Sequence, residues 1–116
     1  MEKNVKVSIL LDIYGKMLTE KQYKLLDDYY NNDLSLSEIA ENERITRQAV
    51  RDNLKKGENK LSQFEEKLLF MKKTLEKEEQ ISKILNELTK IESSSSDKEI
   101  AKILQNIKEK LIELNI

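Results

Sequence analysis

Residues suited to nucleic-acid recognition recur at helical spacing between positions 47 and 55. At about 100° per residue, Arg47, Gln48, Arg51 and Lys55 fall within one sector of about 100° on a helix. Arginine and lysine bind phosphates and guanine, and glutamine pairs with adenine. Residues 46–56 hold four cations and one acid in a chain of net charge −1. We therefore predict a nucleic-acid interface at Arg47, Gln48, Arg51, Lys55 and Lys56. A face of this kind can also be merely a solvated helix surface.

Three residues that can begin helices lie before this segment or at its start. Thr19 with Gln22 and Ser35 with Glu38 form capping boxes, whereas Thr46 can cap a helix without a reciprocal partner. These starts predict four helices, at about 4–17, 19–31, 35–43 and 46–57, with the last ending at Gly57. The short third helix, tight link and fourth helix have the proportions of a helix-turn-helix. The fourth would then be the recognition helix.

Apolar spacing predicts the inward faces of the first two helices. The first is expected to bury Val5, Ile9, Leu10, Ile13, Tyr14 and Met17. The second is expected to bury Tyr23, Leu26 and Tyr30, with Leu25 and Tyr29 at the edge.

The second half of the chain carries a separate helical pattern. Apolar residues from Leu61 to Leu75 and from Ile81 to Ile91 follow 3-4 spacing, interrupted by "EKEEQ" at 76–80. This segment is either one long helix with a stutter or two helices with a break near 76–80. The Ser-rich stretch 92–97 predicts a loop, and about 97–115 predicts a last amphipathic helix.

These patterns divide the chain into two parts, a helix-turn-helix head at 1–60 and a pair or trio of tail helices at 61–116. The tail helices can pair as a hairpin, pack on the head or pack on a second copy. A homodimer is favoured because helix-turn-helix proteins commonly bind paired half-sites. An intrachain bundle without a partner is the alternative.

Composition restricts both the fold and the chemistry. Proline is absent and there are only two glycines, so the fold is predicted to be all-α. Cysteine and histidine are absent, which removes disulfides, thiolate metal sites and the commonest general base. We predict no catalytic residue, cofactor or metal site. No apolar run approaches the roughly 20 residues of a membrane span, and no signal peptide is recognisable, so a soluble cytoplasmic protein is expected.

Residues 5–60 resemble the YlxM family of small bacterial proteins. The resemblance rests on four linked motifs: "DIYG", "LTEKQ", "DYYNNDLSLSEIAE" and "TRQAVRDN". It implies a helix-turn-helix like the fourth region of sigma factors, a DNA-binding regulator with duplex DNA as its partner, and a link to the signal recognition particle. The alternative is an accessory protein that binds the particle's RNA or its GTPase without binding DNA.

Three residues depart from the family pattern. Glu43 stands where an apolar residue usually closes the turn, and Arg44 replaces the usual Gly or Asn. The Arg44 position often needs a positive φ, which penalises residues with a Cβ. Arg51 replaces an aromatic residue and adds charge to the predicted recognition face.

Overall fold

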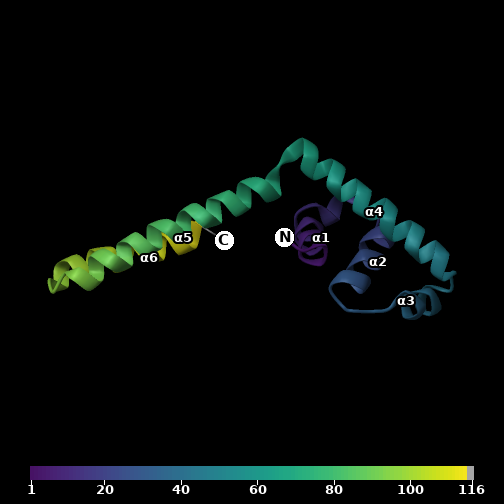
Figure 1. Ribbon diagram of the computed structural model, residues 1–116, viewed down its shortest axis with the longest axis horizontal. Helices are drawn as coiled ribbons and strands as arrows, with labels where there is room; N and C mark the ends of the chain where they lie inside the picture. Colours follow the sequence, from purple (N-terminus) through teal and green to yellow (C-terminus); the bar gives the residue numbers. More distant parts are fainter. Residues whose placement is uncertain (115–116) are drawn as a thin grey trace. The chain divides into compact units, whose positions relative to one another are not determined.

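The protein is all-helical over residues 1–114, which are the residues that the computed structural model describes, and this range contains no strand (Figure 1). The helices are α1 (Lys3–Tyr14), the 3₁₀ helix η1 (Gly15–Met17), α2 (Glu20–Tyr30), α3 (Leu36–Glu43), α4 (Arg47–Leu68), α5 (Phe70–Ser94) and α6 (Lys98–Leu114). The prediction of an all-α fold is therefore confirmed. Residue 115, the expected end of the last helix, lies outside the described residues.

The chain forms two compact units, Met1–Met71 and Lys72–Ile116. From here on, the names head and tail refer to these two units and not to the predicted ranges 1–60 and 61–116. In the head, α4 packs against α1, α2 and α3 (Figure 1). The most deeply buried side chains come from all four of these helices: Leu11, Tyr14, Leu25, Leu26, Ile39, Val50 and Leu61. The long helix α4 is thus the central element on which the three shorter helices are assembled.

The predicted helix starts are confirmed by their hydrogen bonds. The Thr19 hydroxyl accepts from the Gln22 N–H at 3.1 Å, and the Gln22 side chain accepts from the Thr19 N–H at 3.3 Å. Ser35 and Glu38 make the same reciprocal pair at 3.1 and 3.2 Å. The Thr46 hydroxyl accepts from the Ala49 N–H at 3.0 Å. Each such cap stabilises a helix by about 1 kcal/mol.

The predicted inward faces of α1 and α2 are partly wrong. Val5 and Met17 are about half exposed, at 49 % and 53 %, while Val7 and Leu11 are buried. The buried residues of α1 are instead Val7, Leu10, Leu11 and Tyr14, which form one face of the helix. At about 100° per residue Val5 lies on the opposite face, and Met17 lies in η1, beyond the end of α1. In α2 the predicted core residue Tyr23 is exposed, and the predicted edge residue Leu25 is buried.

The expected end of the recognition helix at Gly57 is wrong, because α4 continues to Leu68. Gly57 is buried against α2, where an added Cβ would lie 2.7 Å from Cδ1 of Leu26. Glycine therefore lets two helices approach closely. Glycine in a helix interior is roughly 1 kcal/mol less favourable than alanine, and the close packing of α2 on α4 offsets this loss.

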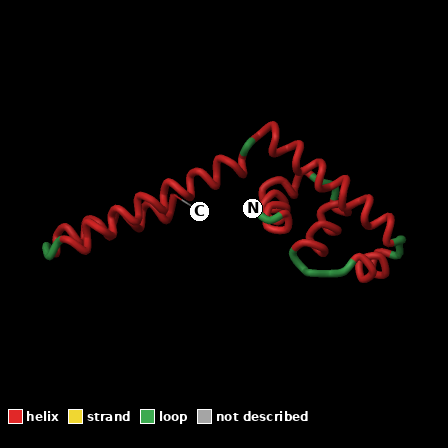
Figure 2. Tube along the Cα trace, viewed as in Figure 1, coloured by secondary structure: helices red, strands yellow, loops and turns green. Residues whose placement is uncertain are grey.

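Neither of the two alternatives left open for this segment, one long helix with a stutter or two helices with a break near 76–80, matches the structure. The helices break at Leu69, whose φ of 57° is left-handed, and α5 then continues without interruption through 76–80 (Figure 2).

A cluster of hydrogen-bonded polar groups surrounds the break between α4 and α5. The Tyr14 hydroxyl donates to Glu65 Oε1 at 2.7 Å and accepts from the Phe70 N–H at 3.1 Å. Glu65 Oε1 also accepts from the Met71 N–H at 2.9 Å, so both the end of α4 and the start of α5 are held.

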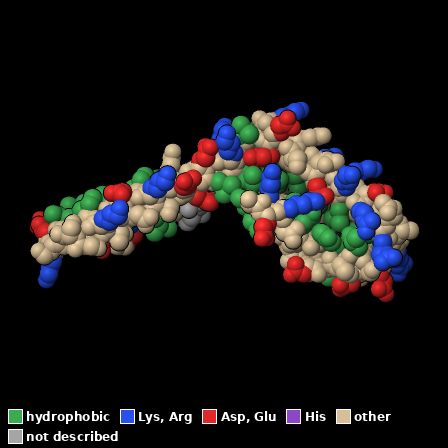
Figure 3. All heavy atoms as spheres, in the orientation of Figure 1, with side chains coloured by type: hydrophobic (Ala, Val, Ile, Leu, Met, Phe, Trp, Pro, Cys, Tyr) green, Lys and Arg blue, Asp and Glu red, His purple; other side chains and the backbone are tan. Residues whose placement is uncertain are grey.

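The tail is an antiparallel pair of helices, α5 and α6. Lys77 Nζ donates to the Leu114 carbonyl at 2.6 Å, and Lys108 Nζ lies 2.7 Å from Glu92 Oε2. The predicted Ser-rich loop is shorter than expected, since α5 extends to Ser94. The two helices leave several large apolar side chains at least 39 % exposed: Ile84, Ile91, Ile100, Ile103, Ile107, Ile112 and Leu114. Hydrophobic side chains are accordingly visible along the tail in Figure 3.

Candidate nucleic-acid interface

The helix-turn-helix consists of α3, a three-residue turn and α4. Arg44 adopts φ 56° and ψ 43°, so the turn does require the left-handed conformation, although the residue is not glycine. The Ile45 N–H donates to the Ala40 carbonyl at 3.0 Å, which closes the end of α3. Thr46 then caps α4. The turn is therefore compact despite its unusual residues.

Glu43 is accommodated in this turn by an ion pair with α2. Lys24 Nζ lies 2.6 Å from Glu43 Oε1, and the Glu43 side chain is mostly covered. The hydrogen bond and charge of Glu43 raise the pKa of Lys24 above its ordinary value. Because Lys24 is exposed, this pair adds little stability. Its effect is to satisfy a carboxylate at a position where the family usually has an apolar residue.

The structure places four of the five predicted contact residues together on the exposed side of α4. Arg47, Arg51 and Lys55 are exposed, and none has a hydrogen bond or ion pair from its side chain to any described residue. Gln48 donates to Asp52 Oδ1 at 2.9 Å, so the acid neighbours the amide and leaves the two arginines unpaired. Lys56 is exposed but lies about 100° further round the helix than Lys55.

Three hollows extend this face along α4. The first hollow lies at the start of α4, between Arg47 and Arg51. The second lies between Arg51 and Lys55, and the third lies beyond Lys55, beside α1. Two lysines of α1 that were not among the predicted contact residues also line these hollows: Lys3 lines the second and third, and Lys6 the third. Nothing in the local sequence connects positions 3 and 6 to α4, because only the packing of α1 on α4 brings them there. We call this surface the basic trough.

Two aromatic residues and one acid form the middle of the basic trough. Tyr29 and Tyr30 meet edge to face, with ring centroids 5.0 Å apart. The Tyr30 hydroxyl donates to Glu58, which also lies 3.3 Å from Lys3 Nζ. Burial and the neighbouring Glu58 carboxylate raise the pKa of Tyr30. Tyr30 therefore remains a neutral donor at physiological pH.

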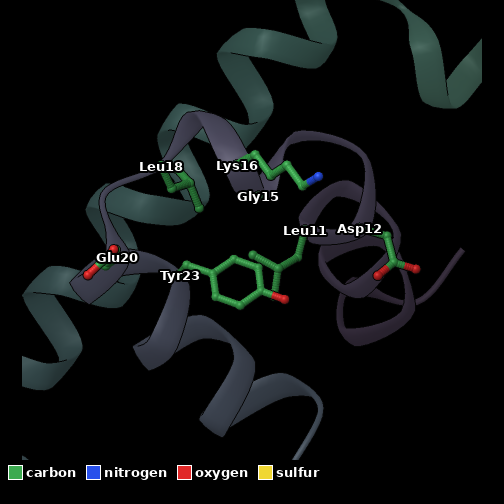
Figure 4. Close-up of a pocket in the computed structure, with 7 residues that line it drawn as sticks. All are labelled: Leu11, Asp12, Gly15, Lys16, Leu18, Glu20 and Tyr23. Atoms are coloured by element: carbon green, nitrogen blue, oxygen red, sulfur yellow. The ribbon is translucent and has the colours of Figure 1, made fainter.

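A separate hollow lies between α1, η1 and α2 (Figure 4). The Tyr23 ring covers Gly15, where a Cβ would come within 2.6 Å of Cε2 of the ring, so only glycine fits without displacement. The rim combines Asp12 and Glu20 with the single cation Lys16. This mixed charge does not favour a polyanion, unlike the charge of the basic trough.

No group of three or more acidic, histidine or cysteine side chains within residues 1–114 could hold a metal ion. Among the same residues, no helix is long and apolar enough to cross a membrane.

Comparison with known proteins extends the family match beyond residues 5–60. Residues 1–114 match a family described as "Putative helix-turn-helix protein, YlxM / p13 like", a description that names a fold motif and no reaction. A UPF0122 protein of Acetivibrio thermocellus is 43 % identical over 114 residues, covering 98 % of this chain and 97 % of the relative. The UPF0122 protein YlxM of Bacillus subtilis is 41 % identical over 111 residues, covering 96 % and 97 %. The chain therefore belongs to the YlxM/p13-like family of helix-turn-helix proteins.

Proposed function

We propose that this protein binds duplex DNA as a regulator, with α4 as the recognition helix. The observation that carries the proposal is the cationic face at the start of α4. Arg47 and Arg51 are exposed and unpaired among the described residues, immediately after the turn of a helix-turn-helix. In proteins of this kind the N-terminal residues of the second helix contact base edges in the major groove.

The chemistry of each residue suggests its role. The guanidinium groups of Arg47 and Arg51 can bind guanine or phosphate in a bidentate manner, and Lys55 can neutralise a phosphate. Gln48 keeps its carbonyl oxygen as an acceptor, because only its amide nitrogen is used by Asp52. Lys56, at the edge of the face, is suited to a flanking phosphate. A role on DNA also implies that the protein acts in the bacterial cytoplasm.

Replacing Arg47 and Arg51 with alanine is expected to weaken binding to duplex DNA by about 100-fold. Two charge-assisted contacts of about 1–3 kcal/mol each would be lost. The salt slope, which is the steepness with which the logarithm of the binding constant falls with the logarithm of the salt concentration, would fall by about two. Fluorescence anisotropy at several salt concentrations measures both quantities.

The matched control is Lys16→Ala with Lys21→Ala. These lysines are exposed and lie in the head, so the control removes the same charge from another surface. Equal affinities of the two double variants would refute the proposed site. The signal recognition particle's RNA hairpin serves as a second probe, since the family resemblance implies that pathway. Stronger binding to the hairpin than to the duplex would favour the accessory role.

We further propose that the tail joins two copies of the protein into a homodimer. Seven large apolar side chains of α5 and α6 are left exposed by the helix pair, and a second pair would cover them as a four-helix bundle does. The tail has nine lysines and nine acidic residues, so two tails have no net charge to repel each other.

A dimer would also hold two recognition helices against paired half-sites. Ile84→Lys with Ile103→Lys is expected to convert the dimer to a monomer in analytical ultracentrifugation. The control places lysine at Asn86 and Gln105, which are exposed polar positions on the same two helices. A wild-type protein that stays monomeric at concentrations up to the millimolar range would rule out the dimer.

A further inference from the structure

We propose that the nucleic-acid interface continues from α4 onto α1, where Lys3 and Lys6 bind the phosphate backbone that borders the site read by α4. This inference rests on the proposed function and adds two contact residues that lie outside the helix-turn-helix. The ligand is the phosphodiester backbone of duplex DNA.

The first argument is the continuity of the basic trough. Neighbouring hollows share Arg51 and then Lys55, so their cations follow one another from the start of α4 to α1. The cations on this path are Arg47, Arg51, Lys55, Lys3 and Lys6, and the acid among its lining residues is Glu58.

The second argument is the geometry of α4. From Arg47 to Lys55 the helix rises by about 12 Å, which is comparable with the roughly 12 Å width of the major groove. If Arg47 enters the groove and α4 runs outward across it, Lys55 comes to the backbone that borders the groove. Lys3 and Lys6 line the hollows at that same end, where a backbone strand would lie.

The third argument is that both lysines can reach a ligand. The Lys3 side chain is 72 % exposed although it pairs with Glu58, and a surface pair of this kind is weak enough to be replaced by a phosphate. Lys6 is exposed and its side chain has no partner among the described residues. Glu58 keeps the hydrogen bond from the Tyr30 hydroxyl as a partner when Lys3 turns to a phosphate.

The test is anisotropy of Lys3→Ala with Lys6→Ala on duplexes of several sequences. Phosphate contacts carry no sequence information, so affinity should fall by about tenfold on every duplex and the salt slope should fall by up to two. Lys3→Arg with Lys6→Arg keeps the charges and should bind like the wild type. Circular dichroism confirms that each variant is folded.

The outcomes separate this inference from the proposed function. If Arg47→Ala with Arg51→Ala weakens binding by about 100-fold while Lys3→Ala with Lys6→Ala binds like the Lys16→Ala, Lys21→Ala control, the α1 contacts are wrong and recognition by α4 stands. If no variant changes binding, both are wrong. A loss confined to one duplex sequence would also overturn the assignment of Lys3 and Lys6 to the backbone.

Discussion

Truncating Leu26 to alanine is expected to lower the free energy of unfolding of the head by about 3 kcal/mol. Leu26 is fully buried, and its Cδ1 lies directly under the backbone of α4 at Gly57. Deleting a buried leucine side chain costs about 2–5 kcal/mol through lost burial and the cavity that remains. Urea unfolding followed by tyrosine fluorescence measures the head alone, because all four tyrosines lie within residues 1–71.

A double-mutant cycle with Gly57 makes this test specific to the contact between α2 and α4. Gly57→Ala alone should destabilise the head, because the new Cβ would lie 2.7 Å from Leu26 Cδ1 and 3.3 Å from its Cγ. In the Leu26→Ala background the same change should stabilise it by up to about 1 kcal/mol, since the cavity accepts the methyl group and alanine favours helix. If Gly57→Ala changed the free energy of unfolding in the same direction in both backgrounds, the Leu26 side chain would not be what excludes a Cβ at position 57.

Replacing Tyr14 with phenylalanine is expected to lower the stability of the head by about 2 kcal/mol. The change keeps the ring packing against Phe64 and Phe70, at centroid distances of 5.9 and 6.2 Å. It removes a buried hydroxyl that bonds a carboxylate and the first N–H of α5, and such bonds contribute about 1.5–3 kcal/mol. The same urea experiment, read by circular dichroism as well as by fluorescence, measures this difference.

The contribution of Tyr14 should disappear at alkaline pH. Burial, followed by the Glu65 hydrogen bond, raises the pKa of Tyr14 above its ordinary value of 10.0. Above pH 10 the unfolded chain therefore loses this proton before the folded chain does, and stability falls as the pH rises through the folded-state pKa. The difference between wild type and Tyr14→Phe should be constant below pH 10 and should shrink above it. Glu65→Gln keeps an acceptor and should shift this loss to lower pH. A difference that does not change between pH 9 and 11 would contradict the raised pKa.

The sequence predicted the local elements of the head well, because their signals are local. Thr19, Ser35 and Thr46 act within three residues of themselves, so their caps could be identified without knowledge of the fold. The exposed cations of α4 follow from helical periodicity in the same way.

The errors arose where contacts between distant residues decide the structure. Gly57 is typical of a helix end in sequence, but Leu26 of α2 is what requires a glycine there. The N–H of Phe70, directly after the break at Leu69, bonds to the hydroxyl of Tyr14, which is 56 positions away in the chain. The same reason explains why Lys3 and Lys6 were missed as candidate contacts, since the packing of α1 on α4 has no signature in either segment.

The central claim, that the exposed face of α4 binds duplex DNA, is tested most directly by anisotropy of the wild-type protein. The probes are a mixed-sequence DNA duplex and the RNA hairpin of the signal recognition particle, each at low and moderate salt. We predict tighter binding to the duplex, with an affinity that falls steeply as salt rises because several phosphates are neutralised. Binding to neither probe at low salt, or binding to the hairpin alone, would contradict the claim.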